Sequence, residues 1–104
     1  MRLVKRKWGH YLTLLDYGKF KVKILRFKER QSCSYQFHSY RNELWLFLSG
    51  GGRFLLDGET SLINKGDFKI VSTRGKHRFT AAKITYVLEI QFGEKCDEND
   101  ITRI

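Results

Sequence analysis

Apolar and polar residues alternate along several short stretches of the chain, and this alternation predicts β-strands. In residues 19–24 lysine alternates with phenylalanine, valine and isoleucine, the period of two that a half-buried strand has. Residues 84–92 give the clearest alternation, and residues 43–49 form a mostly apolar run that ends at three glycines. Sustained helical periodicity is missing, and only residues 97–101 have room for a helical turn. We therefore expect an all-β fold.

Turn signals separate these predicted strands. Asp57 and Gly58 lie between the strand-like residues 53–56 and 59–63, and an Asp-Gly pair is a strong hairpin signal because both positions tolerate a positive φ. A second turn precedes another predicted strand at residues 68–71. Many short strands in a chain of 104 residues predict a single domain, residues 1–104, built as a jelly-roll barrel.

The formal net charge of +9 directs attention to anionic partners. Nucleic acid, a membrane surface and a phosphorylated small molecule all fit such a charge. We expect most of the basic residues to lie on the solvated faces of strands, where charge blocks edge pairing and keeps a sheet soluble. Two groups hold many of them: Arg2, Lys5, Arg6 and Lys7, and then Lys19, Lys21, Lys23, Arg26, Lys28 and Arg30.

The two cysteines and the N-terminus bear on the compartment. Cys33 and Cys96 are far apart in sequence, so one disulfide is allowed but not required. No apolar run follows the N-terminal charges, as it would in a signal peptide, and no stretch approaches the roughly 20 apolar residues of a membrane span. We expect a soluble, cytoplasmic protein.

The residues that suggest chemistry are two of the three histidines. Gln36, His38 and Glu43 have the spacing Q-x-H-x4-E, and side chains two apart on a strand point to the same face. Glu43 can reach the same point across a short loop, and His77 can join from a distant strand. Two imidazoles, a carboxylate and an amide oxygen suit a borderline divalent metal. His10 lacks such neighbours, and we interpret it as an ordinary surface or core residue.

The same spacing resembles the first of two cupin motifs, G-x5-H-x-H-x3,4-E-x6-G. Gln36 stands at the first histidine, His38, Glu43 and Gly50 match, and Arg30 stands at the opening glycine. The second motif reads G-x5-P-x-G-x2-H-x3-N. It is matched at Gly66 and His77, with Ser72, Arg74 and Ala81 at its other positions. The resemblance implies a cupin, which is a double-stranded β-helix.

Nearly the whole chain resembles the C-terminal domain of type II mannose-6-phosphate isomerases, often fused to mannose-1-phosphate guanylyltransferases. Seven family segments occur in order: R-P-W-G-x-Y, F-K-V-K, S-L-Q-x-H-x-H-R-A-E-H-W, V-S-G, L-D-G-E-T, G-T-K-H-R, and E-x-Q-x-G-E with E-D-D-I-x-R. Their counterparts are residues 6–11, 20–23, 34–45, 48–50, 56–60, 75–78, and 89–94 with 98–103. The nucleotidyltransferase domain has no counterpart, so guanylyl transfer is not expected.

This resemblance implies a metal-dependent sugar-phosphate isomerase that interconverts mannose-6-phosphate and fructose-6-phosphate through an enediol. A Lewis acid would stabilise the developing oxyanion, and zinc is the expected metal. The implied metal ligands are Gln36, His38, Glu43 and His77. Arg41 would lie beside the site, and Arg41, Lys76 and Arg78 are the candidate contacts for the phosphate of the substrate.

Departures from the family leave the catalytic step open. The family's run of histidines is reduced to Ser39 and Tyr40, and the histidine after the glutamate is Leu44. No general base follows from the sequence. The alternative is therefore a non-catalytic cupin that binds metal and a sugar or sugar phosphate.

Two expectations concern macromolecular partners. Nucleic-acid binding ranks last, because the net charge and aromatic residues near basic ones, such as Tyr35, Phe37 and Tyr40, are its only support and no nucleic-acid motif is present. Small barrels of this type pair through edge strands, which allows a homodimer.

Overall fold

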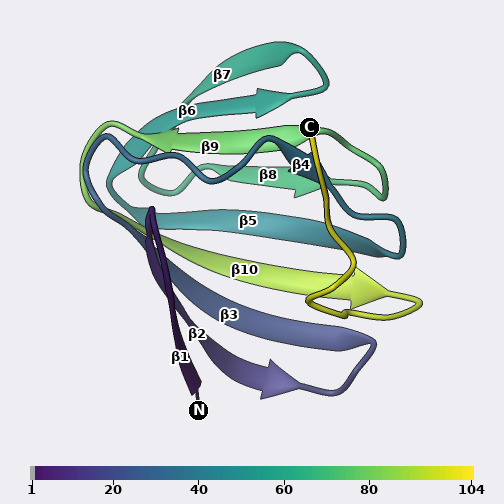
Figure 1. Cartoon of the computed structure of the whole chain (residues 1–104). Coiled ribbons are helices and arrows are strands. Elements are labelled where there is room, and N and C mark those ends of the chain that lie inside the picture. The colour runs from purple at the N-terminus through teal and green to yellow at the C-terminus, as the bar shows by residue number, and fades with distance from the viewer. Residues whose placement is uncertain (1) are drawn as a thin grey trace.

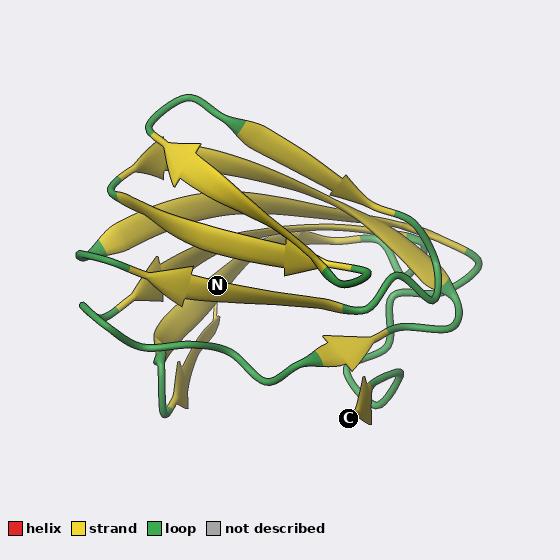
Figure 2. Ribbon diagram, turned by 90° about the horizontal axis from the view of Figure 1, so that it is seen from above, coloured by secondary structure: helices red, strands yellow, loops and turns green. Residues whose placement is uncertain are grey.

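The computed structural model describes residues 2–104, which form strands and loops and contain no helix (Figure 1, Figure 2). The strands are β1 (Arg2–Arg6), β2 (Gly9–Asp16), β3 (Phe20–Phe27), β4 (Gln36–Phe37), β5 (Arg41–Ser49), β6 (Gly51–Leu56), β7 (Glu59–Asn64), β8 (Phe68–Val71), β9 (His77–Ala81), β10 (Thr85–Gly93) and β11 (Thr102–Arg103). The predicted all-β fold is confirmed.

The strands form two antiparallel sheets that face each other across one core. The six-stranded sheet has the order β1-β2-β3-β10-β5-β8, and the five-stranded sheet has the order β11-β4-β9-β6-β7. Aromatic rings join the sheets: the ring centroids of Phe27 and Phe79 are 5.0 Å apart, and those of Phe47 and Phe54 are 6.2 Å apart. All four rings are fully buried. This aromatic cluster anchors one half of the interior, and the other half holds polar side chains.

Most predicted strands lie close to their predicted bounds. The stretches at 19–24, 43–49, 53–56, 59–63, 68–71 and 84–92 become β3, β5, β6, β7, β8 and β10. The hairpin between β6 and β7 turns at Asp57 and Gly58, whose φ angles are +48° and +86°. The tail is different, because a hydrogen-bonded turn after Asp97 does not continue into a helix.

Five strands, β1, β2, β4, β9 and β11, were not predicted from the alternation pattern, although the predicted metal site placed Gln36 and His77 on strands. In β2 the register shifts between Thr13 and Leu15, and a shift of one residue breaks the alternation that identifies a strand. In β9 one of the three inward positions is His77, so the apolar period is interrupted by a polar residue.

Two lysines of β3 depart from the expectation that most basic residues lie on the solvated faces of strands. Lys21 and Lys23 point into the barrel and are buried, whereas Phe20 is 39% exposed and Val22 and Ile24 are half-buried on the other face. Alternation shows that the two faces of a strand differ in polarity, but it does not show which face points into the barrel. Here the polar face is inside because the interior at this end of the barrel is lined by charged partners.

Two arginines stand where the cupin motifs have glycine, and both keep the backbone conformation that glycine favours. Arg30 has φ of +64° and Arg74 has φ of +67°. Residues with a side chain adopt this left-handed region at some conformational cost. The motif therefore persists in the backbone at positions where it is lost in the sequence.

The cysteines Cys33 and Cys96 are both buried and free, so the disulfide that the sequence allowed is not formed. Burial raises the pKa of the Cys33 thiol to about 12. Within residues 2–104, no helix has the length and apolar character needed to cross a membrane.

Candidate metal centre

The inner face of the six-stranded sheet changes from apolar to charged along its strands. Strand register defines three cross-strand rows: Leu25, Val87 and Phe47; then Lys23, Glu89 and Trp45; then Lys21, Gln91 and Glu43. Members of a row lie side by side on strands about 4.8 Å apart. The first row belongs to the core, and the last two rows make the wall of a polar site.

Three side chains converge at the end of this wall. His38 follows β4, Glu43 lies on β5 and His77 begins β9. Their potential ligand atoms all lie within 4.8 Å of one another. His38 Nε2 is 3.1 Å from Glu43 Oε2, and His77 Nε2 is 3.4 Å from Glu43 Oε1. All three side chains are buried, so the predicted spacing does bring these three residues together.

The backbone orients both imidazoles toward the glutamate. His38 Nδ1 is 2.7 Å from the carbonyl oxygen of Asp100, and His77 Nδ1 is 2.9 Å from that of Gly75. A carbonyl only accepts hydrogen bonds, so each Nδ1 carries a proton and each ring turns its Nε2 toward Glu43. Second contacts of this kind are typical of histidines that bind metal.

The carboxylate of Glu43 is held by two further donors. Arg41 Nε donates to Oε2 at 2.9 Å, and Trp45 Nε1 donates to Oε1 at 2.8 Å. Burial alone would raise the pKa of Glu43, but the contacts with His77, His38 and Arg41 outweigh burial and hold this pKa well below its usual range. Glu43 is therefore a carboxylate, which is the form that binds a cation.

The pKa values of the two histidines move in opposite directions. Burial lowers the pKa of His38. Burial acts in the same sense on His77, but the adjacent carboxylate of Glu43 outweighs it and raises the pKa of His77.

These residues fit a divalent metal. His77 Nε2 is fully buried and has no assigned hydrogen-bond partner, and the Nε2 atoms of both histidines face the carboxylate of Glu43. Such an arrangement is stabilised by a cation among the three groups, and two imidazoles with one carboxylate are a familiar zinc donor set. Arg41 supplies positive charge here in the structure, with Nη2 3.3 Å from His38 Nε2. A metal that uses Oε2 of Glu43 would compete with this guanidinium.

The fourth predicted ligand, Gln36, lies beside the cluster. It pairs in register with His77 across β4 and β9. Its side-chain oxygen accepts a hydrogen bond from Ser34 Oγ at 2.8 Å, and the residue lines the interior cavity. Its role as a ligand stays a prediction.

Lys76 and Arg78 point away from the cluster. The side chain of His77 points from β9 into the barrel, so the side chains of its two neighbours are exposed on the opposite side. The guanidinium of Arg78 lies 5.9 Å from the ring centroid of Tyr35. Their predicted contact with a substrate phosphate is not tested by this arrangement, although the geometry puts them outside the cavity.

A cavity of about 120 Å³ adjoins the cluster between the sheets, and its wall includes Gln36, Arg41, Glu89 and Gln91. Gln91 Nε2 donates to Glu89 Oε1 at 2.8 Å, and its own Oε1 is buried without a partner. Burial, followed by the charge of Glu43, raises the pKa of Glu89 to about 7.

Glu89 and Gln91 were not singled out as site residues from the sequence. The signal that could have found them is their position: two polar residues alternate with leucine and isoleucine on a central strand.

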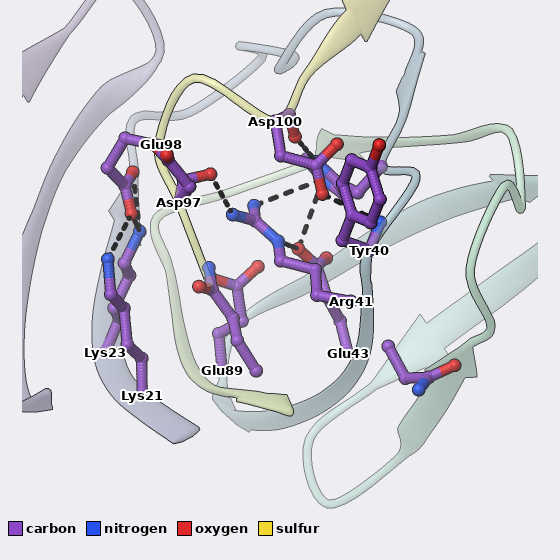
Figure 3. Close-up of polar contacts among 12 residues, drawn as sticks. Lys21, Lys23, Tyr40, Arg41, Glu43, Glu89, Asp97, Glu98 and Asp100 are labelled. Carbon is purple, nitrogen blue, oxygen red and sulfur yellow. Dashed lines mark hydrogen bonds and ion pairs between the residues drawn. The ribbon is translucent and has the colours of Figure 1, made fainter. Parts of the chain in front are cut away.

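The C-terminal segment, residues 94–101, covers this end of the barrel, and Figure 1 shows the tail crossing the strand ends from β10 toward β4. Arg41 Nη1 donates to the carbonyl of Asp97 at 3.2 Å. The carboxylate of Asp100 accepts from the backbone amides of Ser39 and Tyr40 at 2.8 and 2.9 Å. Figure 3 shows these contacts around Arg41.

The family histidines that this chain lacks do not leave gaps in the interior. Leu44 follows inward-facing Glu43 and points to the outer face of the sheet. Tyr40 is 44% exposed, with the ammonium of Lys95 4.4 Å from its ring centroid. The backbone amides of Ser39 and Tyr40 donate to the carboxylate of Asp100. Any residue other than proline at these two positions retains those donors.

Solved structures with the same arrangement support the fold. KdgF from Halomonas sp. matches with a TM-score of 0.80 at 10% identity, covering 91% of this chain and 90% of that chain. The capsular polysaccharide assembling protein CapF from Staphylococcus aureus matches with a TM-score of 0.79 at 17% identity, covering 99% of this chain and 32% of that chain. At such identities the likeness concerns the fold alone. The two facing sheets and the His-Glu-His cluster between them define a cupin.

The sequence comparison is more specific. The family described as "Mannose-6-phosphate isomerase C-terminal" matches residues 1–104, and the chain belongs to this family. The alginate biosynthesis protein AlgA of Pseudomonas aeruginosa is 31% identical over 103 residues, covering 97% of this chain and 21% of the relative. A mannose-1-phosphate guanylyltransferase of Klebsiella pneumoniae is 30% identical over 105 residues, covering 99% and 22%. The chain thus spans about a fifth of the length of these relatives.

Proposed function

We propose that this cupin is a metal-dependent isomerase that interconverts mannose-6-phosphate and fructose-6-phosphate. The observation that carries the proposal is the buried convergence of His38, Glu43 and His77, in a family described by this activity. Arg41, which contacts Glu43, also lines the adjoining polar cavity. Zinc is the proposed metal, with Gln36 as a fourth ligand. When bound, the metal would act as a Lewis acid that stabilises negative charge on the substrate oxygens.

Isomerisation needs a group that moves a proton between C2 and C1. The base takes the proton from C2, and the electron pair of the C2–H bond forms the C1–C2 double bond of an enediol. At the same time O1 gains a proton. Return of a proton to C1, with loss of one from O2, gives the ketose. Glu89 is the buried carboxyl group at the cavity, and its pKa of about 7 lets it take up and release a proton near neutral pH.

Arg41 has a second role in this proposal. Its guanidinium borders the cavity and donates to Glu43, so it can donate to a sugar oxygen as negative charge develops there. Lys76 and Arg78 stay predicted phosphate contacts from the resemblance, without support from their outward position.

A coupled assay for fructose-6-phosphate formed from mannose-6-phosphate tests the proposal. The purified protein is analysed for bound metal, stripped, and reloaded with zinc, manganese or cobalt. The double variant Glu43→Ala, His77→Ala should lose both stoichiometric metal and turnover, while His10→Ala, which removes a histidine outside the cluster, should retain both. Absence of turnover in metal-loaded wild-type protein would sink the isomerase.

The alternative is a metal-binding cupin that holds a sugar or sugar phosphate without converting it. One observation favours it: the cavity of about 120 Å³ is smaller than the ~300 Å³ at which small-molecule pockets usually begin. An isomerase therefore requires the C-terminal segment to move when substrate enters. Binding of mannose-6-phosphate by calorimetry, with no product in the assay, would support the alternative.

Nucleic-acid binding gains nothing from the arrangement of charge. Lys21, Lys23 and Arg41 are buried, so part of the net positive charge faces the interior instead of the surface. A cytoplasmic location and the absence of a membrane or nucleic-acid partner stay predictions.

A further inference from the structure

Two buried lysines face the interior from β3, outside the candidate metal cluster. Lys21 is 8% exposed and Lys23 is 4% exposed. Removing an ammonium group from water is costly unless a counter-charge compensates for it. The main compensating group is Glu98 of the C-terminal segment, and Figure 3 shows its side chain against both lysines. Asp16 adds a second carboxylate, 3.7 Å from Lys21 Nζ.

The carboxylate of Glu98 is surrounded by donors. Lys23 Nζ donates to its two oxygens at 2.7 and 2.9 Å, and Lys21 Nζ donates at 3.3 Å. The hydroxyl of Tyr11 donates to the same carboxylate at 3.2 Å. Arg6 adds charge nearby, with its guanidinium carbon 5.5 Å from the ring centroid of Tyr11. A ring of ammonium and hydroxyl donors around an anion is also how proteins hold phosphate.

The donors and the acceptor differ in how they are fixed. Tyr11, Lys21 and Lys23 belong to two paired central strands, and all three are buried. The side chain of Glu98 is 43% exposed and comes from a loop. The positive site is therefore built into the sheet, while the negative group is carried by the C-terminal loop.

We propose that Lys21, Lys23 and Tyr11 form the phosphate subsite of this cupin, and that Glu98 fills this subsite until the phosphate group of the ligand displaces it. The inference rests on the proposed function for its ligand class, a phosphorylated sugar.

Strand register gives the subsite a suitable distance from the metal cluster. Lys21, Gln91 and Glu43 occupy one cross-strand row, so the lysine and the glutamate are two strands apart, about 10 Å. A six-carbon sugar can bridge that separation with its phosphate at the lysines and C1 and C2 at the cluster. Glu89 lies on the strand between them, next to the reacting carbons.

Glu98 also separates two spaces. It lines the interior cavity and, together with Arg6 and Tyr11, a groove of about 690 Å³ beside β1 and β2. Its displacement would join the groove to the small cavity and make room for the sugar. Burial opposes ionisation, but Lys23 and Lys21 outweigh it and lower the pKa of Glu98 to about 2, so the carboxylate is a charged competitor at neutral pH.

Calorimetric titration of metal-stripped protein with inorganic phosphate, mannose-6-phosphate and mannose tests this subsite. Wild-type protein should bind mannose-6-phosphate about 10- to 100-fold more tightly than mannose. Lys23→Met should weaken binding of both phosphates by a similar factor, and Lys65→Met, which removes an exposed lysine far from β3, should not. Glu98→Gln should bind inorganic phosphate more tightly than wild type, because the competing charge is gone.

Circular dichroism checks that each variant is folded, and Lys21→Met replaces Lys23→Met if the latter does not fold. Unchanged phosphate affinity in the lysine variant, or weaker binding in Glu98→Gln, overturns the subsite. The expected binding pattern without turnover in the metal-loaded wild type overturns only the isomerase. Turnover with the same KM in wild type and the lysine variant overturns only the subsite.

Discussion

At the end that holds the site, the two faces of the six-stranded sheet reverse the usual distribution of polarity. On its inner face, at the end that holds the site, lie Lys21, Lys23, Glu43, Glu89 and Gln91, all buried. On its outer face, half-buried or exposed, lie Val22, Ile24, Leu44, Leu46, Leu88 and Ile90, flanked by the more exposed Phe20, Phe68, Ile70 and Phe92. The same strands supply both sets, so the difference comes entirely from side-chain direction.

This comparison teaches that the interior is organised for charge compensation at one end and for packing at the other. Each buried charge has an opposite or hydrogen-bonding partner, such as Lys23 with Glu98 and Arg41 with Glu43. The aromatic cluster closes the far end of the interior, and the ring of His77 stacks on Phe54 with centroids 6.3 Å apart. An aromatic cluster that excludes water strengthens the electrostatic interactions in the adjacent polar site.

Of the changes on the inner face, removal of the Glu43 carboxylate should destabilise the protein most. Glu43→Ala leaves Arg41 and both histidines without their shared acceptor, so we expect a loss of about 3–5 kcal/mol in the free energy of unfolding. Urea denaturation measures it. Zinc should stabilise the wild type and not the variant, because only the native site binds it. Glu59→Ala, which removes an exposed glutamate, is the matched control, and an equal loss there would contradict the assignment.

Glu89→Gln tests the proton-transfer group on the inner face. We expect kcat to fall by about 10²- to 10⁴-fold with metal content unchanged. In the wild type, kcat should rise with pH through about 7, because a base acts only when deprotonated. The exposed Glu94→Gln should keep the wild-type profile. If Glu89→Gln kept the wild-type kcat and the same rise of kcat with pH, another group would carry out the proton transfer.

The same glutamate gives a stability test with a definite sign. The pKa of Glu89 is raised on folding, to about 7, so protonated Glu89 stabilises the folded protein. This contribution is complete when the pH is below the ordinary pKa of a glutamate, and it is lost as the pH rises through about 7. The free energy of unfolding of the wild type should therefore decline over this window relative to that of Glu89→Gln. Parallel curves would show that the carboxyl group is not perturbed in the folded protein.

Much of the fold and the centre of the site follow from the sequence. Period-two alternation located β3 and β10, and the Asp57-Gly58 pair located the hairpin, since both signals are local. The spacing of His38 and Glu43 put two donors within reach, and His77 joined them as the resemblance implied. These are features for which the chain carries its own short-range or family-specific signal.

The remainder depends on partners that are distant in sequence. Lys23 is inside because Glu98, 75 residues later, neutralises it, and alternation alone does not decide which face of the strand is inside. Lys76 and Arg78 flank a site residue in sequence but face outward, since neighbours on a strand point to opposite sides. Glu89 gains its role from burial beside Glu43, which only the strand register reveals.

The apolar outer face makes the homodimer that the sequence allows testable. Monomeric proteins rarely expose large contiguous apolar patches, so this face, more than the edge strands expected from the sequence, is where a second copy would bind. Ile90→Glu should convert a dimer into a monomer in light scattering. Leu62→Glu adds the same charge at an exposed position on the edge strand β7, and should leave the dimer intact. Dissociation by Leu62→Glu alone would return the interface to the edge.

The smallest effect is expected where the family histidine is restored. Leu44→His places an imidazole on the outer face, one residue from Glu43 but on the opposite side of β5, so it cannot reach the cavity. We expect metal content and kcat to stay as in the wild type, whereas Glu43→His, which changes the inward neighbour, should abolish both. Measured metal content and assay rates compare the two. A marked rise in kcat for Leu44→His would mean that the outer face takes part in the reaction, and the functional distinction between the two faces would then fail.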